Sequence, residues 1–109
     1  MSILIVDDSE EQRELLGLIL KTAGYRSLLF AESAEEALNR LGIGADPRPS
    51  ERIEVVLMDF LMAGMDGLEA CRRIRAEERL KHLPVIVVTA KTEPPDILDA
   101  YTAGATDYI

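Results

Sequence analysis

The 109-residue sequence has no Trp, one Cys and few aromatic side chains, which make up only 5% of the chain. A lone Cys cannot form an internal disulfide, and Cys71 has no second Cys or His at metal-ligand spacing, so we interpret it as a small residue of an amphipathic helix. Because aromatic residues are scarce, the core is expected to consist of Leu, Ile and Val. The length and the 48% hydrophobic composition indicate one compact domain spanning residues 1–109.

Long apolar runs and positive charge are scarce as well. No run approaches the ~20 residues that span a bilayer, and no signal segment follows Met1, so we expect no membrane contact and a cytoplasmic location. The formal net charge of −8 argues against nucleic-acid binding by this segment, because phosphate contacts need clustered Lys and Arg. Basic residues do cluster in one segment, but Glu side chains interrupt them, which is typical of a solvated helix surface. The cluster consists of Arg72, Arg73, Arg75, Arg79 and Lys81, with Glu69, Glu77 and Glu78 among them.

Aliphatic runs typical of buried strands alternate with segments of helical periodicity. Strands are predicted at residues 3–6, 25–31, 53–58, 85–88 and 105–109. Helices are predicted from the N-cap Ser9 to Gly24, from a capping box of Ser33 and Glu36 to Gly42, after the cap Asp66, and from the Pro94-Pro95 pair to Gly104. Residues 42–52 and 60–65 are predicted loops. This alternation predicts an α/β fold with a parallel sheet, right-handed crossovers and helices on both faces.

Polar residues follow three of the predicted strands directly. Asp7 and Asp8 follow the first, Asp59 follows the third and Thr89 follows the fourth. The carboxyl ends of parallel strands meet at one edge of a sheet, and carboxylates brought together there repel one another unless a hard cation such as Mg²⁺ compensates. One carboxylate can then attack phosphorus and become an acyl phosphate, for which Asp59 is the best candidate, with Thr89 as a hydrogen-bond donor to the phosphoryl group. Taken singly, each residue also fits a capping or strand-end role, so the prediction depends on their joint position.

Several motifs of the chain resemble those of receiver domains of bacterial two-component response regulators, over nearly its whole length. The matching segments are Asp7-Asp8, Asp59, Ala63-Gly64-Met65-Asp66-Gly67, Thr89-Ala90 and Gly104-Ala105-Thr106-Asp107-Tyr108, with Ala63 in place of a customary Pro. The resemblance implies a flavodoxin-like, doubly wound, five-stranded parallel sheet of the chemotaxis-regulator type.

The resemblance also implies roles for individual residues and partners. Asp8 and Asp59 would bind Mg²⁺ directly, Asp7 through water, and the backbone carbonyl of Leu61 would complete the protein ligands. Thr89 and the aromatic switch residue Tyr108 would respond to the phosphoryl group and remodel an output surface. The donor would be a sensor histidine kinase or a phosphotransfer protein, an output domain would lie outside this chain, and a homodimer is possible. Such a domain catalyses its own phosphorylation, with possible autodephosphorylation, and is not a turnover enzyme.

The family pattern continues beyond the last residue given. A Lys that pairs with the phosphoryl group and a fifth helix would follow Ile109, so the chain is expected to be truncated at its C-terminus, and Lys91 is a weak substitute. We expect a longer chain to be phosphorylated readily, and the 109-residue form to bind Mg²⁺ but to be phosphorylated poorly.

Two other functions fit parts of the sequence. A pseudo-receiver would keep the fold as an interaction module that needs no phosphorylation. A phosphatase of the haloacid dehalogenase type would also attack phosphorus with a strand-end Asp, but that family has a second Asp two residues later, where this chain has Leu61. A nucleotide-binding function is disfavoured because no Gly-rich loop has a P-loop or dinucleotide-binding pattern.

Overall fold

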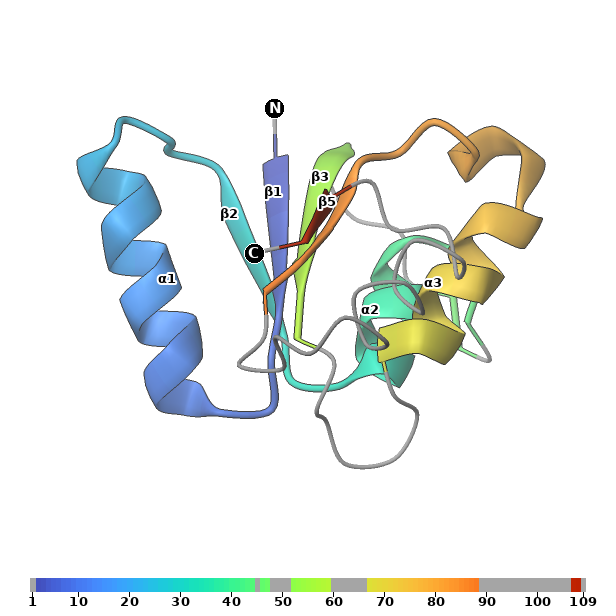
Figure 1. Cartoon of the computed structure of the whole chain (residues 1–109), viewed down its shortest axis with the longest axis horizontal. Helices are drawn as coiled ribbons and strands as arrows, with labels where there is room; N and C mark the ends of the chain where they lie inside the picture. The colour runs from blue at the N-terminus through green and yellow to red at the C-terminus, as the bar shows by residue number, and fades with distance from the viewer. Residues whose placement is uncertain (1, 45, 48–51, 60–66, 89–106, 109) are drawn as a thin grey trace.

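The computed structural model describes residues 2–44, 46–47, 52–59, 67–88 and 107–108. Five parallel strands form one sheet in the order β2-β1-β3-β4-β5. Of the helices that the structure describes, α1 lies on one face of the sheet, and α2 and α3 lie on the other (Figure 1). The strands are β1 (Ser2–Val6), β2 (Leu28–Ala31), β3 (Ile53–Met58), β4 (Val85–Val87) and β5 (Asp107–Tyr108), and the helices are α1 (Glu10–Thr22), α2 (Ala34–Arg40), α3 (Gly67–Ala76) and the short 3-10 helix η1 (Glu78–Leu80). The predicted doubly wound α/β architecture is confirmed.

The main core lies between the sheet and the helices α2 and α3. Alternate strand residues point to this face and are buried, as are the helix residues opposite them. The cluster includes Leu4, Val6, Leu38, Val56, Met58, Ile74 and Val85. Cys71 is buried within it, as its predicted role as a small helix residue requires. The core is therefore aliphatic, as the scarcity of aromatic residues predicted.

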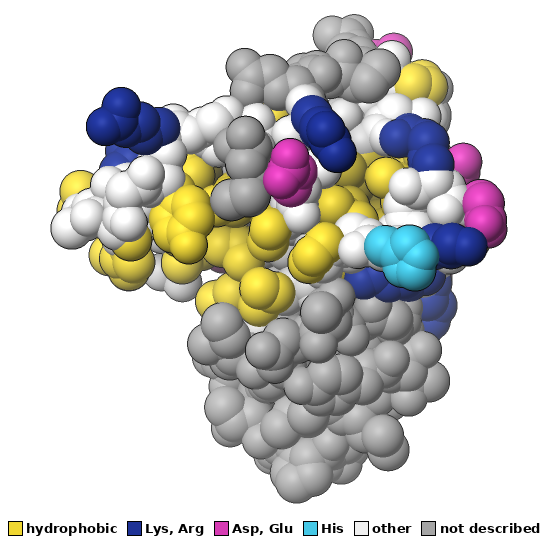
Figure 2. All heavy atoms as spheres, turned by 90° about the horizontal axis from the view of Figure 1, so that it is seen from above, with side chains coloured by type: hydrophobic (Ala, Val, Ile, Leu, Met, Phe, Trp, Pro, Cys, Tyr) yellow, Lys and Arg dark blue, Asp and Glu magenta, His cyan; other side chains and the backbone are white. Residues whose placement is uncertain are grey.

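The opposite face, which α1 covers, is less completely buried. All of β1 is buried, as its aliphatic run predicted. In β4 the middle residue Ile86 is half-buried, and in β3 only Val56 and Met58 are buried, so these two strands are less completely buried than their aliphatic runs suggested. Seen from above the view of Figure 1, the molecule has hydrophobic side chains gathered between Lys and Arg side chains at either side (Figure 2).

The orientation of α1 also differs from the one suggested by its leucine spacing. Gly17 is the buried residue of the helix, and a Cβ built on it would lie 3.1 Å from Cζ of Phe30 on β2. The helix therefore approaches the sheet through Gly17. The helical spacing of Leu15 and Ile19 favours a place on the buried side of α1, but both are turned toward solvent. Leu15 is 50% and Ile19 is 53% exposed.

Glycine ends both α1 and α2 where it was predicted to do so. At Gly24 (φ 102°) the chain turns into a left-handed conformation, and the N–H of Tyr25 donates to the carbonyl of Leu20 at 3.0 Å. Gly42 (φ 82°) ends α2 in the same way. Because the cap of α1 uses the N–H of Tyr25, the strand predicted at residues 25–31 begins only at Leu28.

The predicted N-caps are present, with one difference in detail. The N–H of Gln12 donates to Oγ of Ser9 at 3.3 Å, and the N–H of Glu36 donates to Oγ of Ser33 at 3.1 Å. In a capping box the Glu carboxylate would accept from the N–H of Ser33, but Glu36 Oε2 accepts from the N–H of Glu32 at 2.9 Å. The predicted cap Asp66, the loop at 60–65, Lys91 and the helix from Pro94 to Gly104 lie outside the described residues.

Three of the five basic residues of the predicted cluster pair with acidic neighbours, as expected for a solvated surface. Arg72 and Arg73 lie 3.4 and 3.3 Å from the carboxylate of Glu69, and Lys81 lies 2.9 Å from that of Glu78. Exposed pairs of this kind contribute little to stability, about 0–1 kcal/mol each. The other two basic residues, Arg75 and Arg79, donate instead to the backbone carbonyls of Leu80 and Leu41. None of the described helices has the length and apolarity needed to cross a membrane.

Candidate functional site: an acidic cluster at the strand ends

Two neighbouring strands bring the predicted carboxylates together. β1 and β3 pair in parallel with Val6 opposite Met58, so the residues after each strand emerge side by side. The N–H of Asp59 donates to the carbonyl of Val6 at 3.0 Å, which continues the pairing of the two strands by one step. Strand order reverses here, because β2 lies on one side of β1 and β3 on the other. Such a point is where parallel sheets commonly bind ligands.

The three carboxylates form one cluster. One oxygen atom from each of Asp7, Asp8 and Asp59 lies within 4.8 Å of the other two. Asp7 is buried, Asp59 is half-buried and Asp8 is exposed, so the cluster extends from the interior to solvent. The prediction that Asp7, Asp8 and Asp59 meet is confirmed.

Asp7 is held at three points, and each hydrogen bond fixes a different group of the residue. Its N–H donates to the carbonyl of Ala31 on β2 at 3.1 Å, and its Oδ1 accepts from the N–H of Ser9 at 2.9 Å. Its carbonyl accepts from Nη1 of Arg13 at 2.8 Å. The position of Asp7 is therefore set by β2, by the start of α1 and by a side chain of α1.

The donor set fits a hard divalent cation. All three groups are carboxylates, and hard cations such as Mg²⁺ prefer oxygen ligands at about 2.0–2.1 Å and commonly keep some bound water. Three carboxylates this close repel one another, and a cation compensates that repulsion. Asp8 and Asp59 are accessible enough to contact an ion directly, while Asp7 lies deeper.

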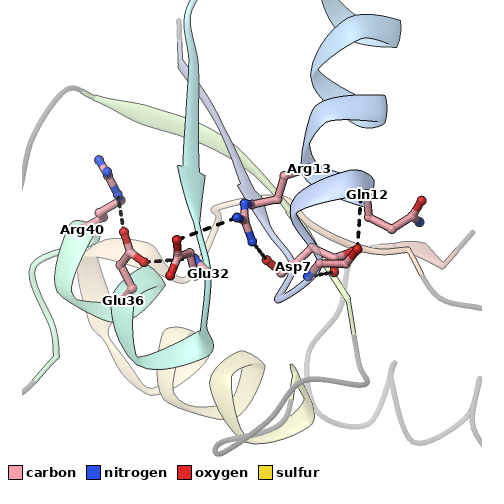
Figure 3. A network of polar contacts seen from close by, with 7 residues as sticks. Asp7, Gln12, Arg13, Glu32, Glu36 and Arg40 are labelled. Carbon is pink, nitrogen blue, oxygen red and sulfur yellow. Dashed lines mark hydrogen bonds and ion pairs between the residues drawn. The ribbon is translucent and has the colours of Figure 1, made fainter.

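A chain of polar contacts connects this site to α2, and sequence reasoning missed it. Nη2 of Arg13 lies 3.7 Å from Oε1 of Glu32, the N–H of Glu32 donates to Glu36, and Glu36 lies 3.7 Å from Nε of Arg40 (Figure 3). One signal was present in the sequence: Arg13 is the sole basic residue between the acidic pair and Lys21.

Three other predicted site residues lie wholly or partly beyond the described structure. Leu61 and Thr89 are outside the described residues. Tyr108 belongs to β5 by its backbone, which pairs with Val87 of β4, but its side chain is not among the described groups.

Comparison with known proteins identifies the family. The model of the response regulator receiver domain matches residues 3–109. The chain belongs to the response regulator receiver family. It is 36% identical to the chemotaxis protein CheY of Pseudomonas aeruginosa over 109 residues, which is 100% of this chain and 82% of that protein. It is 35% identical to the transcriptional regulatory protein YvrH of Bacillus subtilis, covering 99% of this chain and 41% of that protein.

A solved receiver structure adds a likeness in three dimensions. The Mn²⁺-bound form of response regulator Rcp1 matches with a TM-score of 0.88 and 27% sequence identity, over 99% of this chain and 78% of that one. As a receiver domain, the chain has its acidic cluster at the strand edge where β1 and β3 end.

Proposed function

We propose that the chain is the phospho-acceptor of a two-component signalling system and that Asp59 takes a phosphoryl group from a sensor histidine kinase or a phosphotransfer protein. The observation that carries the proposal is the cluster of Asp7, Asp8 and Asp59 at the ends of two paired strands of a receiver domain. The likeness to a Mn²⁺-bound response regulator supports a divalent cation at this place.

The position of Asp59 suits a nucleophile. Its N–H is fixed by the carbonyl of Val6, and its carboxylate is half-buried, so the group is held in place yet open to a donor. In the transfer, a bond forms between a carboxylate oxygen of Asp59 and phosphorus. The bond from phosphorus to the donor histidine nitrogen breaks, and its electron pair stays on that nitrogen. Such a transfer depends mainly on positioning and on stabilisation of negative charge.

The remaining residues would hold the cation and respond to the phosphorylated state of Asp59. Asp8 and Asp59 would bind Mg²⁺ directly, Asp7 through water, and Leu61 through its backbone carbonyl. A divalent cation held there would offset part of the negative charge of the carboxylates and of the phosphoryl oxygens. Thr89 would donate a hydrogen bond to the phosphoryl group, and Tyr108 would change position with it, which would shift an equilibrium between two packings of the surface.

The proposal also includes the location of the protein and the way in which it acts. The domain would act in the cytoplasm, would accept a phosphoryl group rather than turn over a substrate, and would control an output domain or a separate target.

The test compares the chain with its Asp59→Asn variant. Both are treated with acetyl phosphate and MgCl₂ and weighed intact over time, with an EDTA-treated sample as the metal control. We expect the mass of one phosphoryl group to be gained by the parent chain only, and only with Mg²⁺. Because Asp59→Asn sets the baseline, even a slow gain of phosphate by the parent chain above that baseline supports Asp59 as the acceptor.

Other results would favour other functions. Phosphate gained equally by the Asp59→Asn variant would contradict the assignment of the acceptor. No phosphate under any condition would favour a pseudo-receiver, and steady release of phosphate from a phosphomonoester would favour a phosphatase of the haloacid dehalogenase type.

A further inference from the structure

Arg13 is a half-buried cation beside the acidic cluster, and its side chain contacts that cluster instead of extending into solvent. Its side chain is only 14% exposed, although it belongs to the first turns of α1. The guanidinium donates from Nη1 to the carbonyl of Asp7 at 2.8 Å (Figure 3).

The carbonyl of Asp7 needs such a donor because of its place in the sheet. β1 ends at Val6, the N–H of Asp7 makes the last bond to β2, and the N–H of Asp59 bonds to the carbonyl of Val6. The carbonyl of Asp7 thus lies one step past the strand pairing, on a residue that is only 4% exposed. Leaving a buried carbonyl without a donor is unfavourable, and Arg13 removes this cost.

The contact of Arg13 with Glu32 is the weaker of its two interactions. The Nη2 to Oε1 distance is 3.7 Å and the Glu32 side chain is 77% exposed, so solvent screens the pair. The N–H of Glu32 is in turn bonded to Glu36 at the start of α2. The bond to the carbonyl of Asp7 is therefore the contact through which Arg13 acts on the cluster, and Glu32 contributes little to it.

We propose that Arg13 is a positioning residue that holds Asp7 in the geometry that receives a divalent cation. This inference rests on the proposed function only in requiring that the cluster binds such an ion. The bond to the Asp7 carbonyl and the bond from Ser9 to its carboxylate together fix the main chain and the side chain of the deepest carboxylate.

The direction in which Mg²⁺ affinity changes when Arg13 is removed distinguishes a positioning role of Arg13 from a purely electrostatic one. Removing a positive charge near a cation site lowers electrostatic repulsion, so on charge alone an Arg13→Ala variant would bind Mg²⁺ more tightly. If positioning dominates, the same variant binds more weakly, because groups that orient metal ligands commonly change affinity by about 10-fold or more.

The experiment measures Mg²⁺ and Mn²⁺ dissociation constants by calorimetry, which suits a chain without Trp. We expect Arg13→Ala to bind about 10-fold more weakly. Arg13→Lys keeps a donor for the Asp7 carbonyl and should recover most of the affinity. Glu32→Gln should change the affinity little, because the pair it removes is exposed.

Arg75→Ala is the matched control. Arg75 is also half-buried and also donates to a backbone carbonyl, that of Leu80 at 3.2 Å, but it lies near the end of α3. Its removal should leave metal affinity unchanged. Tighter or unchanged binding by Arg13→Ala, or an equal loss in Arg75→Ala, would overturn the proposal.

A second readout needs no metal. Loss of the hydrogen bond should move the carbonyl ¹³C resonance of Asp7 in Arg13→Ala, and less so in Arg13→Lys, while Arg75→Ala leaves it in place. If the parent chain bound neither ion, the metal part of the proposed function would fail, whereas this resonance would still decide whether Arg13 positions Asp7. An unmoved Asp7 resonance in both Arg13 variants would refute the inference, also when Arg13→Ala is too unstable to titrate.

Discussion

At the scale of single residues, the three carboxylates differ in what their removal should do. Asp8 is exposed, so replacing it with Asn disturbs no packing, yet it takes one charge out of the cluster. We expect Asp8→Asn to weaken Mg²⁺ binding about 10-fold or more, because a ligand is lost, and to raise the metal-free stability by about 1 kcal/mol, because repulsion is relieved. Calorimetric titration and urea unfolding in EDTA measure the two effects.

The prediction is specific because metal affinity is expected to fall while metal-free stability rises. Glu35→Gln, an exposed acidic residue on α2, serves as the control and should change neither quantity appreciably. An Asp8→Asn variant that lost both metal affinity and stability would show that Asp8 has a structural role instead.

Residues of the site were predictable to the extent that strand pairing places them. Asp7, Asp8 and Asp59 follow aliphatic runs, and parallel strands must end at one edge, so their meeting follows from the pattern. Arg13 was missed because its partner is a backbone carbonyl, which no side-chain motif marks.

At the scale of elements, Gly17 within α1 and Gly24 just past its end should respond to substitution by Ala with opposite changes in the free energy of unfolding. Gly24 has a φ of 102° and open space around it, so Gly24→Ala meets only backbone strain and should lower the free energy of unfolding by about 1 kcal/mol. Gly17 is helical, and Gly17→Ala should gain up to about 1 kcal/mol from helix propensity.

The gain in stability expected for Gly17→Ala depends on whether the ring of Phe30 can move away from the added methyl group. The contact of 3.1 Å is with the far end of its ring, which is half-buried and borders a hollow of about 340 Å³ lined also by Leu18 and Lys21. The ring can shift into that space. Urea unfolding of both variants checks the pair, and a strong loss in Gly17→Ala would show that Phe30 is fixed.

The elements themselves were predicted better than their packing. Caps at Ser9, Ser33, Gly24 and Gly42 are where local chemistry places them, because each depends on only a few neighbouring residues. The half-buried side of β3 and β4, and the exposure of Leu15, depend on how α1 sits against the sheet. The close approach of Gly17 to Phe30 is part of that placement, and no local pattern of the sequence marks it.

At the scale of the whole molecule, the net charge of −8 and the acidic cluster should link stability to divalent ions. At matched ionic strength, MgCl₂ should raise the midpoint of thermal unfolding more than NaCl does, because the proposed site at the cluster would bind Mg²⁺ in the folded state and not Na⁺. A ligand at 100 times its dissociation constant adds about 2.7 kcal/mol. Thermal scans of the parent chain and Asp8→Asn test this, and an equal response to both salts would point to general screening.

The graded burial of the three carboxylates gives the site a direction. Asp8 meets solvent, Asp59 lies halfway and Asp7 is at the closed end. An incoming ion can therefore exchange its water shell for carboxylate oxygens one ligand at a time, while Asp7 stays tied to the sheet and to Arg13. We expect ion exchange to be limited by the rate at which the ion sheds water, and to be slower for Mg²⁺, which dehydrates reluctantly, than for Ca²⁺.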